Sequence, residues 1–231
     1  MNILVTGATG LVGMALRERL AGGPHTVVAT DATRHGRDDP AVVLAPLEDL
    51  EALAALARRQ RITHIVHCGA ISGPMFAHDN PLAVVRSNID GTANLLEIAR
   101  RMRVARFVFC SSISVYGDVG PGLIAEDTPL RPTSIYGASK VAGEQLVRAF
   151  GVQYGLSGVS LRPARVYGPY RRENCFIGDV IRDARSGGRT TIPCDPAFPY
   201  HYIYVEDVVD AIELALAARQ FDHTEYNVAP A

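Results

Sequence analysis

Short apolar, β-branched runs alternate strictly with segments of helical periodicity along most of this chain. Strands that alternate with helices in this way bury both of their faces in a parallel sheet covered by helices on each side. The expected strands span residues 3–6, 26–30, 42–44, 64–67, 106–110 and 158–162, and the expected helices span residues 11–20, 47–59, 81–102 and 136–154. The pattern therefore predicts an α/β fold with a doubly wound parallel sheet.

The first strand leads directly into a glycine-rich turn, Gly7-Ala-Thr-Gly10-Leu-Val-Gly13, and a helical pattern follows at once. Glycines let such a turn bend sharply and let its backbone approach a pyrophosphate, which the helix N-terminus then faces. The first interval is one residue longer than in the usual fingerprint, so the strand–turn–helix context carries much of the weight. We expect a bound dinucleotide here.

Asp31 ends the second expected strand, where a carboxylate accepts hydrogen bonds from the adenosine ribose and repels a 2′-phosphate. Arg34 and Arg37 follow closely and could attract that phosphate instead. Because Asp31 has a fixed place at the strand end and the arginines lie in a loop, we expect NAD rather than NADP.

The pattern loosens after Arg162, where prolines interrupt a loop-rich stretch. Helices are expected at residues 176–184 and 205–218, and a further strand at residues 226–228. Open α/β folds usually form their substrate pockets beyond the carboxyl ends of the strands. We expect residues 1–165 to form the NAD-binding domain with the catalytic residues. Residues 166–231 would form a small substrate lobe, interleaved with the core, that is either compact or lacks a part.

The 231 residues carry a formal net charge of −1, and 48% of them are hydrophobic, as in a soluble globular protein. The absence of a basic excess argues against nucleic-acid and membrane-surface binding. No apolar run is long enough to span a bilayer, and the N-terminus has no features of a signal peptide. The four cysteines lack metal-ligand spacing, so we expect free thiols, no metal site and a cytoplasmic protein.

Lys140 is the only lysine in the chain, and it lies four residues after Tyr136. On a helix this spacing puts the ammonium and the phenol on one face. A nearby cation favours the phenolate, which prepares a tyrosine for acid–base work, and an arginine could not replace a compact ammonium that relays protons. Taken alone, such a pair is more often a chance surface lysine on an amphipathic helix, and it is the rest of the chain that favours a catalytic pair.

The chain resembles the extended short-chain dehydrogenase/reductase family, in its epimerase/dehydratase branch, over nearly its whole length. The resemblance rests on several segments in their usual order. They are Thr6-Gly7-Ala-Thr-Gly10-Leu-Val-Gly13, His67-Cys-Gly-Ala70, Asn88-Ile-Asp-Gly91-Thr92, Ser111-Ser112-Ile-Ser-Val-Tyr116-Gly117, Tyr136-Gly-Ala-Ser-Lys140, Arg162-Pro-Ala-Arg-Val-Tyr-Gly168-Pro169 and Tyr204-Val-Glu-Asp207-Val. The family implies a Rossmann-type sheet that binds NAD.

The resemblance also implies a catalytic set. Ser112 would hydrogen-bond the reacting oxygen, Tyr136 would act as general base or acid, and Lys140 would support Tyr136 and hold the nicotinamide ribose. Asn88 would position a proton-relay water, although a purely structural role is nearly as well supported. Tyr116 is expected to close the pocket.

Further contacts follow from the same resemblance. Cofactor contacts are expected from residues that follow the strand ends: Gly7, Gly10, Leu11, Gly13, Asp31, Leu47, Cys68, Ala70 and Pro163, together with Tyr136 and Lys140. Leu47 or the backbone would meet the adenine, because Pro46 stands where relatives often have an Asp. Substrate contacts are expected from Ser72, Ser112, Arg165 and Tyr200.

Departures from the family pattern shape the expected reaction. Ile113 and Ser114 replace the Asp-Glu pair of the 4,6-dehydratases, so we do not expect dehydration. Tyr200-His201 stands where nucleotide-sugar epimerases usually carry an Arg that clamps the diphosphate, and this clamp is therefore in doubt. We expect hydride transfer at a sugar-type carbinol, as epimerisation or net dehydrogenation. A non-catalytic dinucleotide-binding regulator is the alternative.

Arg165 replaces an Asn that relatives place beside the substrate, and Arg171 and Arg172 follow in the same loop. A guanidinium matches a carboxylate or phosphate in a bidentate way, which predicts an anionic substrate. The alternative is an internal ion pair with Glu173 or Asp179.

A homodimer is expected through a four-helix bundle, which the family builds from helices equivalent to residues 81–102 and 136–154. Its apolar contacts would come from Ala142, Leu146 and Ala149 with Leu95 and Ile98, unless these residues face the sheet.

Overall fold

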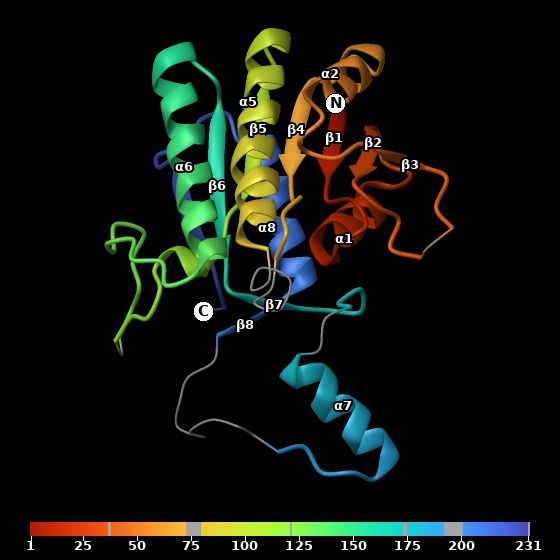
Figure 1. Cartoon of the computed structure of the whole chain (residues 1–231), viewed down its shortest axis with the longest axis vertical. Helices are drawn as coiled ribbons and strands as arrows, with labels where there is room; N and C mark the ends of the chain where they lie inside the picture. The colour runs from red at the N-terminus through yellow and green to blue at the C-terminus, as the bar shows by residue number, and fades with distance from the viewer. Residues whose placement is uncertain (37, 73–79, 121, 173–174, 192–200, 231) are drawn as a thin grey trace.

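The structure is a computed structural model that describes residues 1–36, 38–72, 80–120, 122–172, 175–191 and 201–230. In these residues seven parallel strands form one sheet in the order β3-β2-β1-β4-β5-β6-β9 (Figure 1). The strands are β1 (Asn2–Thr6), β2 (Thr26–Asp31), β3 (Val42–Leu44), β4 (His64–His67), β5 (Arg106–Cys110), β6 (Gly158–Pro163) and β9 (Glu225–Val228). The predicted doubly wound parallel sheet is confirmed.

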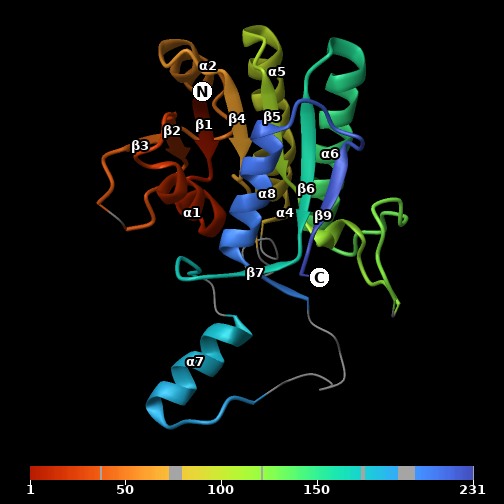
Figure 2. The same cartoon turned by 180° about the vertical axis from the view of Figure 1, so that it is seen from behind.

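Helices cover both faces of the sheet (Figures 1 and 2). The helices are α1 (Leu11–Leu20), α2 (Leu50–Arg59), α4 (Pro81–Val85), α5 (Gly91–Met102), α6 (Ile135–Tyr154), α7 (Phe176–Ser186) and α8 (Val205–Ala217). One apolar core joins α1 and α8 to the sheet, and a second joins α2, α5 and α6 to its other face. Neighbouring strand residues divide between the cores, as Ile3 and Leu4 do, because successive side chains point to opposite faces.

The sequence predicted one regular helix over residues 81–102, but the structure has three joined pieces there. A π-helix, η1 (Arg86–Asp90), lies between α4 and α5. Such π-turns often occur at functional sites, and this one contains the buried Asn88. Helix α2 begins at Leu50 rather than Leu47, because the Asp49 side chain caps it by accepting from the Ala52 N–H at 2.9 Å.

The order of the sheet reverses between β1 and β4. In an open α/β sheet, the crevice at such a switch point is where ligands bind, outside the carboxyl ends of the strands. The glycine-rich turn follows β1, and the segment from Cys68 to Ser72 follows β4, so both lie at this crevice.

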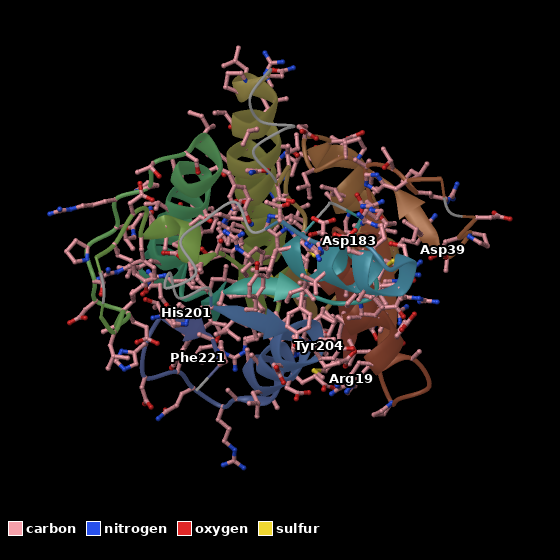
Figure 3. All side chains as sticks on the ribbon, turned by 90° about the horizontal axis from the view of Figure 1, so that it is seen from below. Arg19, Asp39, Asp183, His201, Tyr204 and Phe221 are labelled. Carbon is pink, nitrogen blue, oxygen red and sulfur yellow. The ribbon has the colours of Figure 1, made fainter. Side chains whose placement is uncertain are left out.

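Part of the segment 166–231 returns to the main sheet. Helix α8 packs beside α1, and β9 pairs in parallel with β6. Two short parallel strands that the sequence did not predict, β7 (Arg165–Tyr167) and β8 (Tyr202–Tyr204), form a separate ribbon below the sheet. This ribbon and α7 extend beyond the carboxyl ends of the strands (Figure 1). Figure 3 looks onto that side, where α7 crosses in front of the sheet near Tyr204.

Candidate active site

The glycine-rich turn packs its backbone closely against the segment after β4. Gly7 has a φ of +63°, and a Cβ there would lie 2.6 Å from the Gly69 backbone. A Cβ on Gly13 would lie 2.2 Å from the Gly7 carbonyl oxygen. Helix α1 then starts at Leu11 with Gly10 as its N-cap, which supplies no side-chain acceptor for the first N–H groups. Such an uncapped helix start, reached through glycines, fits a pyrophosphate.

Asp31 is held at the end of β2 beside this turn. One carboxylate oxygen accepts from the Thr9 N–H at 3.0 Å and the Thr9 hydroxyl at 2.7 Å, and the other accepts from the Ala32 N–H at 2.8 Å. The oxygen that accepts only from Ala32 keeps a lone pair for a ribose hydroxyl. Arg34 donates to the carbonyl oxygens of Asp39 at 2.9 Å and Val42 at 3.1 Å, which favours a structural role. Arg37 lies outside the described residues.

The other predicted cofactor contacts all come after strands of the same sheet edge. Leu47 is buried after β3, Cys68 and Ala70 are half-buried after β4, and Pro163 is buried at the end of β6. Ideal Cβ atoms on Gly69 and Gly91 would both meet Leu47, so this side chain closes the edge of the turn. These residues surround the crevice as the fold class predicts.

Three elements bring Ser112, Tyr136 and Lys140 together at the end of β5. Ser112 begins a 3₁₀ turn, η2 (Ile113–Val115), and its hydroxyl accepts from the Ser114 N–H at 3.1 Å. The first turn of α6 packs closely against η2. This is possible because residue 137 is a glycine, since a Cβ on Gly137 would lie 2.6 Å from the Ser114 carbonyl oxygen. The Lys140 ammonium lies 5.7 Å from the centre of the Tyr136 ring.

Lys140 is only 3% exposed, and its ammonium donates to the Cys110 carbonyl oxygen at 2.7 Å. The ammonium also lies 4.8 Å from the centre of the Phe109 ring, within cation–π distance. Burial lowers the pKa of Lys140 to about 8, against the opposing effect of Cys110, Cys68 and Glu144. A lysine with this pKa can both hold and release a proton near neutral pH.

Asn88 links the crevice to the catalytic helix. Its carbonyl oxygen accepts from the Ile71 N–H at 2.8 Å, and its amide group donates to the Ile71 carbonyl at 3.1 Å and the Ser139 hydroxyl at 2.9 Å. Ser139 in turn donates to the Tyr136 carbonyl at 2.7 Å. These bonds satisfy the Asn88 side chain within the protein, which favours the structural role that the sequence left open.

A buried polar network behind the site was not predicted from the sequence. Glu144 and Arg162 form a bidentate ion pair at 2.8 and 2.9 Å, with exposures of 0% and 3%. Glu144 also accepts from the Ser111 hydroxyl at 2.5 Å, next to Ser112. Glu144 lies one helical turn after Lys140. A second charged residue on the same face of the helix was the sequence signal that could have indicated a buried ion pair.

Tyr116 belongs to this network and does not close a pocket. Its side chain is 1% exposed, and its hydroxyl accepts from Arg162 at 2.7 Å and donates to the Asn227 carbonyl oxygen at 2.7 Å. The paired hydroxyl stabilises the junction of β6, β9 and the loop after η2, because buried polar groups need partners.

Of the residues that we expect to contact the substrate, Arg165 lies on the β7–β8 ribbon. Arg165 is exposed, with its guanidinium 5.9 Å from the centre of the Tyr202 ring. Asp179, a proposed alternative partner, pairs with Arg182 at 2.9 Å, and Glu173 lies outside the described residues. Ser72 is exposed after β4, and Tyr200 also lies outside the described residues.

Two further observations concern the described part of the chain. It contains no cluster of three or more His, Cys, Asp or Glu residues that could hold a metal ion. It also contains no helix long and apolar enough to cross a membrane.

A family model described as the NAD dependent epimerase/dehydratase family matches residues 3–229. The chain belongs to this family. Members depend on NAD, and the crevice described above fits that cofactor through its uncapped helix start and the carboxylate of Asp31.

Relatives of this epimerase/dehydratase family member include UDP-sugar 4-epimerases. The UDP-glucose 4-epimerase of Mycolicibacterium smegmatis is 35% identical over 225 residues, which cover 91% of this chain and 72% of that protein. UDP-glucuronate 4-epimerase 1 of Arabidopsis thaliana is 35% identical over 212 residues. The chain spans about half the length of that second relative, 48%.

Solved structures of the family superpose on nearly the whole chain. The Thermus thermophilus UDP-glucose 4-epimerase in complex with NAD gives a TM-score of 0.85 at 33% identity, over 99% of this chain and 78% of that one. The dTDP-glucose 4,6-dehydratase DesIV of Streptomyces venezuelae, with NAD bound, gives 0.84 at 28% identity, over 99% and 75%.

We predict that Glu144→Gln lowers the free energy of unfolding by about 3–5 kcal/mol, because Arg162 would keep a buried charge without its carboxylate. Glu97→Gln is the matched control, since Glu97 pairs with Arg100 and Arg101 on the surface of α5. That change should cost about 0–1 kcal/mol. Urea denaturation measures the free energy of unfolding of both variants. An equal loss of stability in the two would contradict the role of the buried pair.

We also predict that Lys140 titrates near pH 8. Because Lys140 is the only lysine, protein labelled with ¹³C at lysine Cε should show one titrating signal, with a midpoint about 8 instead of the ordinary 10.5. Between these values the unfolded chain binds the proton and the folded chain does not, so stability rises with pH in that window. A midpoint near 10.5 would show that the ammonium is solvated.

Proposed function

We propose that this chain is an NAD-dependent epimerase that inverts a carbinol of a nucleotide-activated sugar. The observation that carries the proposal is the convergence of Ser112, Tyr136 and Lys140 at the crevice beside the glycine-rich turn. Relatives named as UDP-glucose and UDP-glucuronate 4-epimerases support this choice over net dehydrogenation.

The side chains supply the proton chemistry of the reaction. Tyr136, favoured as phenolate by the nearby Lys140 ammonium, takes the proton of the sugar hydroxyl while Ser112 hydrogen-bonds the same oxygen. When bound, NAD supplies the acceptor and donor of hydride at the reacting carbon. After the ketone has turned its other face to the cofactor, Tyr136 returns the proton, and no net oxidation results.

Dehydration fits the site less well. Loss of water needs an acid–base pair beside the reacting carbon, but Ile113 packs against the apolar core and Ser114 hydrogen-bonds Ser112 at 3.0 Å. The buried carboxylate of Glu144 is committed to Arg162. These contacts favour epimerisation, although 4,6-dehydratases share the fold.

The proposed substrate is a UDP-sugar, which is anionic through its diphosphate. Arg165 and Arg172 are exposed on the ribbon and the loop that follows it, while Arg171 donates to the Val166 carbonyl at 2.7 Å. A guanidinium on this side could replace the usual clamping arginine, whose place is taken by Tyr200-His201.

The protein should convert UDP-glucose or UDP-glucuronate to its 4-epimer without accumulating NADH. Tyr136→Phe should lower turnover by about 10²–10⁴-fold, the usual share of a positioned acid–base group, with NAD affinity nearly unchanged. Lys140→Arg should also lose turnover, because the larger guanidinium cannot take the place of the buried ammonium.

Chromatography of the nucleotide sugars and absorbance of NADH measure these outcomes. Steady growth of NADH would show a dehydrogenase, and a keto-deoxy sugar would show a dehydratase. Binding of NAD without turnover of any sugar would favour a regulator. Full activity of Tyr136→Phe would refute the catalytic assignment.

We further propose that the protein forms a homodimer through α5 and α6. Leu95 and Ile98 do not contribute, because both are buried against the sheet, at 0% and 1% exposure. The exposed Val152 and Tyr154 and the half-buried Leu146 of α6 provide apolar surface instead. Light scattering at micromolar concentration should give twice the mass of the chain, and a monomer would contradict the proposal.

A further inference from the structure

Two thiols lie in contact at the crevice, and the proposed reaction assigns no chemistry to either sulfur atom. His67 and Phe109 are partners in the pairing of β4 with β5, so Cys68 and Cys110 come next on the two strands and stand side by side. Their sulfur atoms are 3.3 Å apart. Cys110 is buried and Cys68 is half-buried.

The backbone geometry at this point is suited to a disulfide. Neighbouring strands lie about 4.7–4.9 Å apart, within the Cα separation of about 4.4–6.8 Å that disulfides span. The sulfur atoms would have to approach from 3.3 Å to about 2.05 Å, by rotation of the two side chains together with a small shift of the backbone that carries them. The strands themselves can stay in register.

The surroundings prepare one of the two thiols to react. The hydrogen bond from Cys68 lowers the pKa of Cys110, and the Lys140 ammonium lowers it further. The same hydrogen bond, together with burial, raises the pKa of Cys68. Cys110, next to the Lys140 ammonium, is therefore the thiol that ionises more readily and can act as the nucleophile, and Cys68 is the thiol that can resolve it.

We propose that Cys68 and Cys110 form a reversible oxidation site for hydrogen peroxide, which closes to a disulfide and disables the cofactor crevice. Oxidation begins when the Cys110 thiolate attacks an oxygen of hydrogen peroxide, so that the O–O bond breaks, a sulfenic acid forms and hydroxide leaves, which becomes water by taking up the proton that the thiol released. Cys68 then attacks the Cys110 sulfur and expels a second water. The two thiols lose two electrons and two protons, and the peroxide is reduced to two waters.

Both residues of the pair are tied to the parts that would hold NAD. The Cys110 carbonyl accepts from Lys140 at 2.7 Å, and the Cys68 N–H donates to the Thr6 carbonyl at 3.3 Å, directly before the glycine-rich turn. Gly69 packs against Gly7. Drawing the sulfur atoms together would shift the anchor of Lys140 and the wall of the turn, so NAD should bind more weakly to the oxidised protein.

The test uses the Cys175→Ser/Cys194→Ser protein, in which only the proposed pair remains. After treatment with hydrogen peroxide, intact mass should fall by two hydrogen atoms, and a non-reducing digest should contain one peptide that joins residues 68 and 110. A dithiol should reverse both changes. A gain of oxygen without the cross-link, or no reaction, would overturn the proposal.

The functional arm is a titration with NAD, which needs no sugar substrate. Affinity should fall severalfold on oxidation and return with the dithiol, and prior saturation with NAD should slow the cross-linking. Adding Cys110→Ala to the same background should abolish both the cross-link and the reversible loss of affinity, each judged against that variant's own untreated state. Persistence of the reversible loss would mean that another group is oxidised.

Oxidation should also abolish epimerisation of the sugar, and this is the one expected result that rests on the proposed function. If the cross-link forms but the reduced protein epimerises no sugar, the oxidation site stands and the proposed function fails. If the sugar is epimerised equally well before and after complete cross-linking, the inhibitory role of the disulfide is wrong.

Discussion

The buried ion pair of Glu144 and Arg162 is the interaction on which the candidate site depends most. Glu144 lies on α6, which also carries Tyr136 and Lys140, and Arg162 lies on β6. Through its bond to Ser111, the same carboxylate also holds the end of β5 next to Ser112. A pair of this kind adds little stability over an apolar contact, but breaking it is costly, so it enforces one placement of the helix on the sheet.

The parallel sheet explains why residues far apart in the chain meet at one edge. The carboxyl ends of all the parallel strands lie at one edge of the sheet. The turn after β1, the thiols at the ends of β4 and β5 and the loop after β6 therefore meet at that edge. Helix α6 carries Tyr136 and Lys140, the proposed acid–base pair, beside that edge. Because Lys140 is buried among these segments, small movements of Cys110 or Phe109 reach the ammonium directly.

Local patterns were sufficient to predict most of the fold, but not its long-range polar contacts. Alternating apolar runs located the strands of the main sheet, and the four-residue spacing of Tyr136 and Lys140 predicted their shared face. Strands β7 and β8 are as short as β3, but they lie in the proline-interrupted stretch after Arg162, where no alternation with helices marks them. The partnership of Glu144 with Arg162, the π-helix at Asn88 and the burial of Leu95 depend on tertiary packing, which spacing along the chain does not encode.

We propose that the site removes a hydrogen from the sugar carbon as hydride and returns the same hydrogen. The most direct measurement follows UDP-glucose that carries deuterium at C4 through the reaction in ordinary water. Retention of the deuterium at C4 in the epimer, with none released to solvent, is the predicted result. Replacement of the deuterium by solvent hydrogen would show inversion by deprotonation at carbon and would contradict the assignment of Ser112, Tyr136 and Lys140 to hydride-transfer chemistry.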